Sequence, residues 1–273
     1  MNSSLQADCA RCFGLCCVAL PYAISADFAV DKDGGTPCRN LQDDFRCGIH
    51  QHLRDKGFKG CTVYECFGAG QKVSRNTFSG MDWKTHPGLA KDMFDIFPIM
   101  QQLQEMLYYL TEAVNLNETK AIHQALEVAI DEIEKLTQRR ASEIKQTNVS
   151  DIRMKINELL IRTSELVRAE FIHKKYQIKG KASDLIGAKL QKADLRGAKL
   201  RGALLIAADL KNADLRKCDL IGADLRDADL SGADLRGSIF LTQAQVNSAK
   251  GNADTKLPVS LNHPNHWLKV KAK

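Results

Sequence analysis

Residues 183–242 read SDLIG AKLQK ADLRG AKLRG ALLIA ADLKN ADLRK CDLIG ADLRD ADLSG ADLRG SIFLT. The stretch repeats every five residues, and the central position of its twelve units is Leu in all but the last, where it is Phe240. A fixed short period of this kind is the sequence signature of a solenoid. The small residue and the Leu of each unit are two apart, so an extended chain places both on one face. The pattern therefore predicts stacked coils around a core of Leu and small side chains.

This pattern resembles the pentapeptide-repeat family, whose consensus is A(D/N)LXX and whose fold is a right-handed quadrilateral β-helix with four units per coil. The resemblance implies three coils within residues 179–242, in which residues twenty apart stack in columns. The expected inward columns are Leu185/Leu205/Leu225, Leu190/Leu210/Leu230, Leu195/Leu215/Leu235 and Leu200/Leu220/Phe240. Cys218 falls at a small position, where we expect a buried structural thiol.

The same register predicts the outer surface of the repeats. One column of Asp (194, 214 and 234) is expected beside one of Arg (196, 216 and 236), so that opposite charges lie next to each other. Other outward positions are apolar: Ile186, Leu204, Ile206, Ile221, Ile239 and Leu241. Because exposed apolar patches are typical of contact surfaces, we expect another part of this chain or a second protomer to cover them.

Eight of the nine cysteines lie in the first 66 residues: Cys9, Cys12, Cys16, Cys17, Cys38, Cys47, Cys61 and Cys66. The opening spacing, C-x2-C-x3-C-C, brings several sulfurs within one or two turns of chain, close enough to share a metal ion whose bonds to sulfur are about 2.3 Å long. Thiolates are soft ligands that suit zinc and iron-sulfur clusters. The sequence therefore predicts a zinc or iron-sulfur site made by these cysteines.

This region also resembles the YkgJ-like zinc- or iron-chelating family, on the residues CARCFGLCC (9–17), TPCRNL (36–41), FRCGIH (45–50) and GCTVYEC (60–66). The chain departs from that family where Leu53-Arg54-Asp55 replaces an Arg-Pro. The resemblance implies a metal site and leaves the metal open. Four disulfides in a secreted protein and reactive redox thiols are the alternatives, and His50 or His52 offers a substitute for one sulfur.

The rest of the chain predicts helices and a cap. Apolar residues recur at helical spacing from Leu89 to Val114, with Pro98 expected to kink or restart the helix. Further helices are expected over 118–140 and from Ser150 onward. We predict four segments in an α+β fold: a Cys-rich metal-binding module (1–86), a helical hairpin or bundle (87–178), the pentapeptide repeats (179–242), and a C-terminal cap and tail (243–273). In the last segment, Thr242 begins a short helix, Trp267 covers the final coil, and Lys269, Lys271 and Lys273 form a mobile end.

The sequence offers no catalytic constellation, and we predict a non-enzymatic protein that binds a metal and presents its repeats to a protein partner. The net charge of +6 is not gathered into one basic footprint, and no apolar run reaches eighteen residues, so neither direct nucleic-acid binding nor a membrane span is expected. A reduced metal site favours a cytoplasmic location. Two alternatives stay open: antibiotic resistance through protection of a DNA topoisomerase such as gyrase, and an iron-sulfur redox or modification protein. The apolar sides of the repeats and the helices are both surfaces for a homodimer.

Overall fold

The computed structural model describes residues 3–171 and 184–268 of the chain, which divides into two compact units. The first unit comprises residues 1–116 and 120–160, and the second comprises 117–119 and 161–273. The repeat's first residue, Ser183, the predicted boundary at 178/179 and the predicted tail (Lys269, Lys271 and Lys273) lie outside the described residues. No helix in the described part of the chain has the length and apolar character that crossing a membrane requires.

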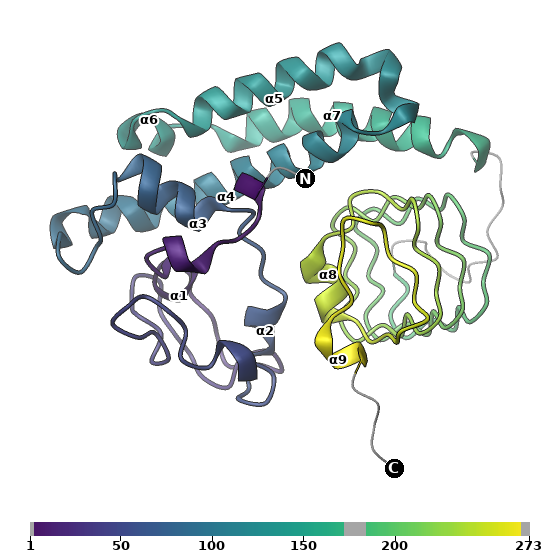
Figure 1. Ribbon diagram of the computed structural model, residues 1–273, viewed down its shortest axis with the longest axis horizontal. Helices are drawn as coiled ribbons and strands as arrows, with labels where there is room; N and C mark the ends of the chain where they lie inside the picture. Colours follow the sequence, from purple (N-terminus) through teal and green to yellow (C-terminus); the bar gives the residue numbers. More distant parts are fainter. Residues whose placement is uncertain (1–2, 172–183, 269–273) are drawn as a thin grey trace. The chain divides into compact units, whose positions relative to one another are not determined.

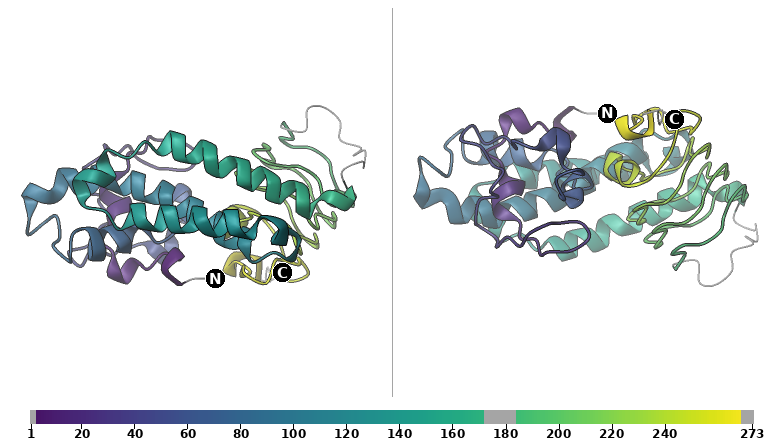
Figure 2. Two further views of the ribbon diagram at one scale, coloured as in Figure 1. Left: turned by 90° about the horizontal axis from the view of Figure 1, so that it is seen from above. Right: turned by 90° about the horizontal axis from the view of Figure 1, so that it is seen from below.

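The first unit is organised around one long helix, α4 (Ala90–Val114), which carries the predicted apolar stripe. The helix continues through Pro98 without restarting. A proline inside a helix costs about 3 kcal/mol. Burial of the neighbouring Phe97 and Met100 side chains offsets this cost. The helices α5 (His123–Thr137) and α6 (Ala141–Lys145) pack against it (Figures 1 and 2). The helix predicted over 118–140 is shorter than expected, because residues 118–122 belong to a 3-10 segment (Asn117–Ile122) and α5 ends at Thr137. The helix α6 was not predicted.

The helix α7 (Val149–Val167) begins one residue before the predicted Ser150. Its first part runs beside α4, since Arg153 donates to Gln102 at 3.3 Å and pairs with Glu105 at 3.2 Å. The division between the two units falls within this helix, after Leu160.

The cysteine-rich part of the first unit has little regular structure. Its elements are short: Ser3–Leu5, Cys9–Arg11, α1 (Leu15–Ala19), His50–His52, α2 (Lys59–Thr62), α3 (Ala69–Gln71), the π-helical turn Lys72–Thr77, and Pro87–Leu89. Two apolar clusters lie within it. The larger includes Phe13, Leu15, Val73 and residues of α4, and the smaller consists of Cys38, Leu53 and Phe58 with partly buried neighbours. Three buried residues contribute little hydrophobic stabilisation, so a further stabilising interaction is expected in this part of the chain.

In the second unit the repeats stack as coils with a twenty-residue period. Parallel bridges join Asp194 to Asp214 and Asp214 to Asp234, and the same spacing recurs from Asp184 to Ile239. Every member of the four predicted inward columns is buried, with exposures of 6% or less. The predicted column register is therefore confirmed, and we call the stack of residues 184–241 the repeat solenoid (Figure 1).

The prediction of a quadrilateral β-helix, and of the α+β class with it, is wrong: the residues described form helices but no β-strand or sheet. The reason lies in the five-residue unit. Each unit contains a two-residue turn, so a single residue per unit makes a bridge to the next coil. Several turns also place a non-glycine residue at positive φ, as at Asn212 and Asp227. A run of one bridging residue is too short to continue as a strand.

The C-terminal cap is present as predicted. Thr242 accepts the N–H of Gln245 at 3.2 Å and begins α8 (Gln243–Ser248), while the side chain of Gln245 donates to the carbonyls of Leu220 and Ala223. Trp267, in α9 (Asn265–Leu268), is buried in the core of the repeats, and its indole N–H donates to Ala249 O at 3.0 Å. These bonds satisfy backbone groups that an open end would leave unpaired.

The predicted apolar exterior is only partly exposed. Ile239 and Leu241, predicted to face outward, are 1% and 3% exposed, and Leu241 packs with Val246 and Leu261 of the cap. Ile186 and Leu204 in the first two coils remain 55% and 40% exposed.

Candidate metal centre and interaction surface

All eight clustered cysteines are free thiols in the first unit, and they differ in exposure. Cys38 is buried, Cys9 and Cys61 are exposed, and the other five are intermediate. Among the described residues, no three His, Cys, Asp or Glu side chains stand close enough together to hold a metal ion as they are placed. Whether the cysteines suit a metal therefore depends on what surrounds each sulfur.

Two of the cysteines lie in matching turns with the sequence Cys-Phe-Gly, at 12–14 and 66–68. In each turn the N–H of the glycine donates to the cysteine sulfur two residues before it. Gly14 and Gly68 have φ of +66° and +82°, values that favour glycine. A Cβ on Gly68 would also lie 2.1 Å from the carbonyl oxygen of Ser4. The backbone conformation and the lack of space for a Cβ both require glycine at position 68. In each turn the glycine N–H points toward the cysteine sulfur.

The same arrangement recurs at two further cysteines. The N–H of Asn40 donates to Cys38 Sγ at 3.5 Å, and that of Ile49 donates to the sulfur of Cys47. The hydroxyl of Tyr22 adds a bond to Cys38 Sγ at 3.3 Å. Hydrogen bonds donated to sulfur favour the thiolate, which is the form that binds metal.

Burial works in the opposite direction. It raises the pKa of Cys9 to about 11 and those of Cys12 and Cys61 to about 12, with neighbouring sulfurs adding to the effect. Burial first, and then repulsion between several anions in one poorly solvated region, therefore favour the neutral thiols. A bound cation would remove that penalty. Sulfur-rich donors, N–H groups aimed at them and a buried Asn40 Nδ2 with no hydrogen-bond partner in the described part of the chain together fit a thiophilic metal.

One buried lysine stands beside the cysteines. Lys32 is 7% exposed, and its Nζ donates to the carbonyls of Val18, Asp33 and Thr36 at 3.2, 3.0 and 3.1 Å. Burial lowers the pKa of Lys32, and the nearby sulfurs of Cys38 and Cys17 act against this change. A cation held here is suited to offset thiolate charge.

The turn at Cys12 is held in place by hydrogen bonds to both main-chain groups of Phe13. The N–H of Phe13 donates to Ser74 Oγ at 3.0 Å, and its carbonyl accepts the indole N–H of Trp83 at 2.8 Å. Ser74, Tyr22 and Lys32 were not identified from the sequence as neighbours of the cysteines. The repeated Cys-Phe-Gly was the signal that could have located these turns.

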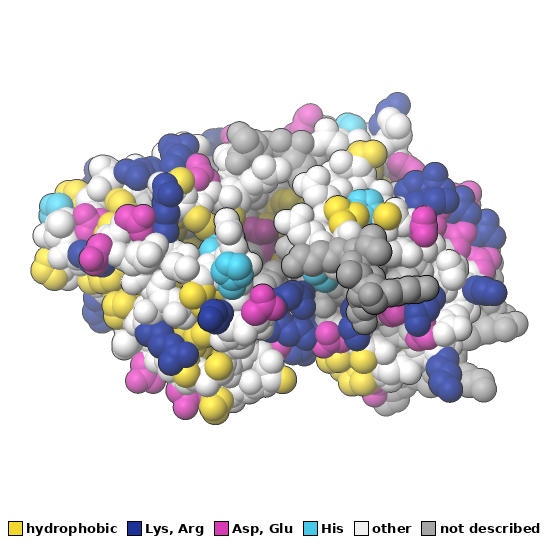
Figure 3. Space-filling view, turned by 60° about the horizontal axis from the view of Figure 1, so that its bottom comes forward, with side chains coloured by type: hydrophobic (Ala, Val, Ile, Leu, Met, Phe, Trp, Pro, Cys, Tyr) yellow, Lys and Arg dark blue, Asp and Glu magenta, His cyan; other side chains and the backbone are white. Residues whose placement is uncertain are grey.

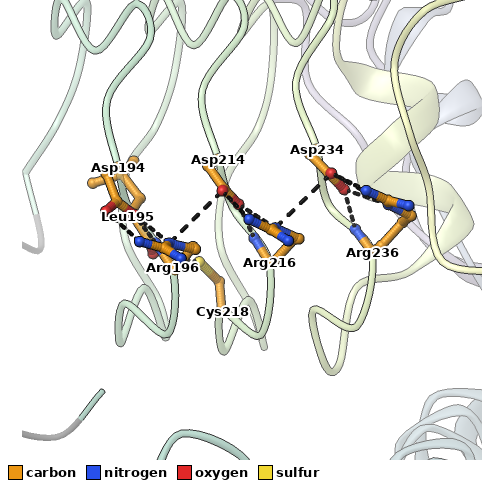
Figure 4. Close-up of polar contacts among 8 residues, drawn as sticks. All are labelled: Asp194, Leu195, Arg196, Asp214, Arg216, Cys218, Asp234 and Arg236. Atoms are coloured by element: carbon orange, nitrogen blue, oxygen red, sulfur yellow. Dashed lines mark hydrogen bonds and ion pairs between the residues drawn. The ribbon is translucent and has the colours of Figure 1, made fainter. Parts of the chain in front are cut away.

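Other predicted candidates have no such surroundings. His50 and His52 are exposed on a single 3-10 turn. Cys218 is fully buried in the repeat solenoid and donates to Leu195 O at 3.0 Å, as expected of a structural thiol (Figure 4).

The outer face of the repeat solenoid carries the predicted Asp and Arg columns (Figure 4). Arg216 pairs with Asp214 of its own unit through Nη2 to Oδ2 at 2.6 Å, and its Nε lies 3.9 Å from Asp234 Oδ2 in the next coil. Arg196 repeats this arrangement with Asp194 and Asp214. Each acidic side chain is thus matched locally, and Figure 3 shows acidic and basic groups interspersed over the repeats at the right of the view.

Comparison with known proteins agrees with the repeat analysis. The family model "Pentapeptide repeats" matches eight copies over residues 181–202 and 203–240. The uncharacterized protein YybG of Bacillus subtilis (strain 168) is 63% identical over 268 residues, covering 98% of this chain and 96% of YybG. The chain belongs to the YybG family. The resemblance of residues 9–66 to metal-chelating proteins stays a prediction.

Proposed function

We propose that this member of the YybG family is a non-enzymatic scaffold in which the cysteine-rich part binds a metal and the repeat solenoid binds another protein. The observation that carries the metal half is the recurring N–H donation to sulfur, seen at Cys12, Cys38, Cys47 and Cys66. Such donors compensate part of the thiolate charge before any metal arrives.

The donor set suits zinc or an iron-sulfur cluster, both of which take cysteine thiolates. A structural metal here would contribute folding free energy to a region with short helices and a small apolar cluster. The chain's own residues would hold the sulfurs in place: Ser74 and Trp83 fix the turn at Cys12, and Tyr22 orients Cys38.

Metal analysis of the full chain, purified under reducing and anaerobic conditions, tests this half. We expect bound zinc in a colourless protein or iron with broad visible absorption, and we expect chelation to lower the melting temperature of the first unit. A Cys218→Ser variant is the matched control and should keep the metal, since its thiol lies in the second unit. Protein that binds neither metal after reconstitution would exclude the proposal.

The second half rests on the surface of the repeat solenoid. Its acidic and basic side chains form pairs of opposite charge, as Asp214 and Arg216 do. Ile186 and Leu204 stay exposed in the first two coils. A rigid surface combining paired charges with apolar side chains suits a protein partner. The same pairing gives no support to imitation of a polyanion such as DNA, so topoisomerase protection is not favoured.

Crosslinking to the full chain in a host lysate tests the binding half. We expect a recurring protein that is retained by the wild type and by an exposed-site control, Gln191→Lys, but lost with Ile186→Lys/Leu204→Lys. Retention of the same protein by the double variant would assign its binding to another surface.

A further inference from the structure

The eight cysteines fall into two groups that pack in different places, although α1 joins them. Cys16 and Cys17 are consecutive in this helix, so their side chains point about 100° apart. Cys16 packs against the larger apolar cluster, as do Cys12 and Cys66. Cys17 packs against the smaller cluster, which contains Cys38 and is also contacted by Cys47. The helix therefore directs two neighbouring sulfurs to different surroundings.

A single glycine links Cys12 with Cys66. Its N–H, that of Gly70, donates to the sulfur of Cys66, and a Cβ added to Gly70 would lie 2.6 Å from Cys12 Sγ. Both sulfurs thus lie against the same residue. Cys9 lies one short turn before Cys12, whose N–H donates to its carbonyl at 3.5 Å. The N–H of Asp8, the residue before Cys9, donates to the side chain of Gln71 at 3.1 Å, and Gln71 follows Gly70 in the chain, so Cys9 is held beside this set.

The backbone connects three of the remaining cysteines. The N–H of Cys38 donates to the carbonyl of Cys17 at 2.9 Å. Leu41 donates to the carbonyl of Cys38 at 2.9 Å and forms an antiparallel bridge with Cys47. Cys17, Cys38 and Cys47 are therefore held together by main-chain contacts.

Aromatic packing brings Cys61 to the same set. Its neighbour Gly60 lies against Phe28 so closely that a Cβ would be 2.3 Å from the ring. Phe28 stacks on Tyr22 with ring centroids 4.4 Å apart, and the Tyr22 hydroxyl reaches Cys38.

We infer that the cysteines make two separate four-sulfur sites: a first group of Cys9, Cys12, Cys16 and Cys66, and a second group of Cys17, Cys38, Cys47 and Cys61. The inference rests on the proposed metal binding and adds the number and composition of the sites. Four thiolates complete the coordination of one tetrahedral, thiophilic ion such as Zn²⁺, so the chain holds two. The Cys16 and Cys17 sulfurs are 3.9 Å apart, which makes the two sites adjacent.

Zinc counting by native mass spectrometry on the reduced full chain tests the partition. Cys9→Ser and Cys61→Ser form a matched pair, because both thiols are exposed and each variant removes one sulfur from one group. We expect two zinc ions in the wild type and in Cys218→Ser. Under a chelator concentration that leaves the wild type loaded, we expect one ion in each single variant and none in the double variant.

The outcomes separate this inference from the function on which it rests. A wild type with one zinc ion that both single variants lose would overturn the partition and keep metal binding. Loss of both ions from either single variant in protein with unchanged circular dichroism would also overturn it, because the sites would then not be separate. A wild type that binds no zinc and no iron would overturn both. As a second measurement, Co²⁺ loading of the single variants should give half the thiolate-to-metal charge-transfer absorption of the wild type.

Discussion

The buried Leu columns and the exposed Asp and Arg columns of the repeat solenoid should contribute very differently to its free energy of unfolding. Leu215 is the middle member of its column, is 1% exposed, and lies between Leu195 and Leu235. Its truncation in Leu215→Ala should cost about 2–5 kcal/mol, from lost burial and the cavity left behind. Arg216, whose side chain is 43% exposed, pairs with Asp214 in solvent. Arg216→Ala should therefore cost much less than the Leu truncation, because an exposed ion pair contributes little to stability.

Urea unfolding can separate these values if the signal comes from the second unit alone. Trp83 and Trp267 are the two tryptophans, and Trp267 is buried in the core of the repeats. Both substitutions would thus be made in a Trp83→Phe background and followed by fluorescence. With a slope of about 1.5 kcal/mol per molar urea, a loss of about 3 kcal/mol moves the midpoint by about 2 M, whereas the Arg216 variant should move it by a much smaller amount.

Equal shifts in the two variants, or a larger shift for Arg216→Ala, would refute this reasoning. Such a result would mean that the charge columns, rather than the Leu columns, hold the coils together. The ion pair across coils is long, at 3.9 Å, and this is the physical reason for expecting the opposite.

Three further outcomes follow from the same contacts. Arg216 holds the pKa of Asp214 below its ordinary value, so the pair's contribution to the free energy of unfolding is fully present above about pH 4. This contribution is lost as the pH falls through the lowered pKa of the folded protein. Urea midpoints measured between about pH 5 and pH 2 should therefore fall less in Arg216→Ala than in the wild type. Gly68→Ala should weaken zinc binding by about tenfold or more in chelator competition, since a positive φ costs about 1–2 kcal/mol, while Gly88→Ala, where a Cβ meets nothing within 4 Å, should match the wild type. Glu65 is adjacent to Cys66, so its charge opposes thiolates there; Glu65→Gln should slow chelator-driven release of one zinc ion and leave the other unchanged, and equal slowing of both would contradict this.

The sequence predicted the repeat core well because a fixed period leaves little freedom. Once four units make a coil, residues such as Leu195, Leu215 and Leu235 must stack, and they are buried as expected. The β-helix was wrong because each unit spends two residues in a turn and one in a bridge. The composition of a unit predicts which side chains face inward, but the length of its extended segment depends on the turn.

The cysteine region was harder to predict because its contacts join residues far apart in the chain. Spacing alone put Cys12 with Cys16 and Cys17, and could not show that Cys66, more than fifty residues later, meets Cys12 across Gly70. The buried Lys32 also could not be recognised, since its environment is created by carbonyls from three separate residues. The two Cys-Phe-Gly turns could be recognised in the sequence, and they predict the contacts of each sulfur within its own turn but not those with distant residues.

The repeat solenoid and the smaller cluster of the cysteine region depend on different physical interactions for their stability. The repeat solenoid has a continuous Leu and Ala core closed by Trp267, so it needs no ligand to bury its apolar surface. The buried members of the smaller cluster of the cysteine region are Cys38, Leu53 and Phe58, and the sulfurs around it would repel one another if they were ionised without a cation. Under the proposed function, metal binding therefore adds stability where this second cluster is small. A chelator or an oxidant would then unfold the cysteine region while the repeat solenoid stays folded, whereas urea would act on both. Metal supply would thus control one half of the protein without altering the surface that the other half presents.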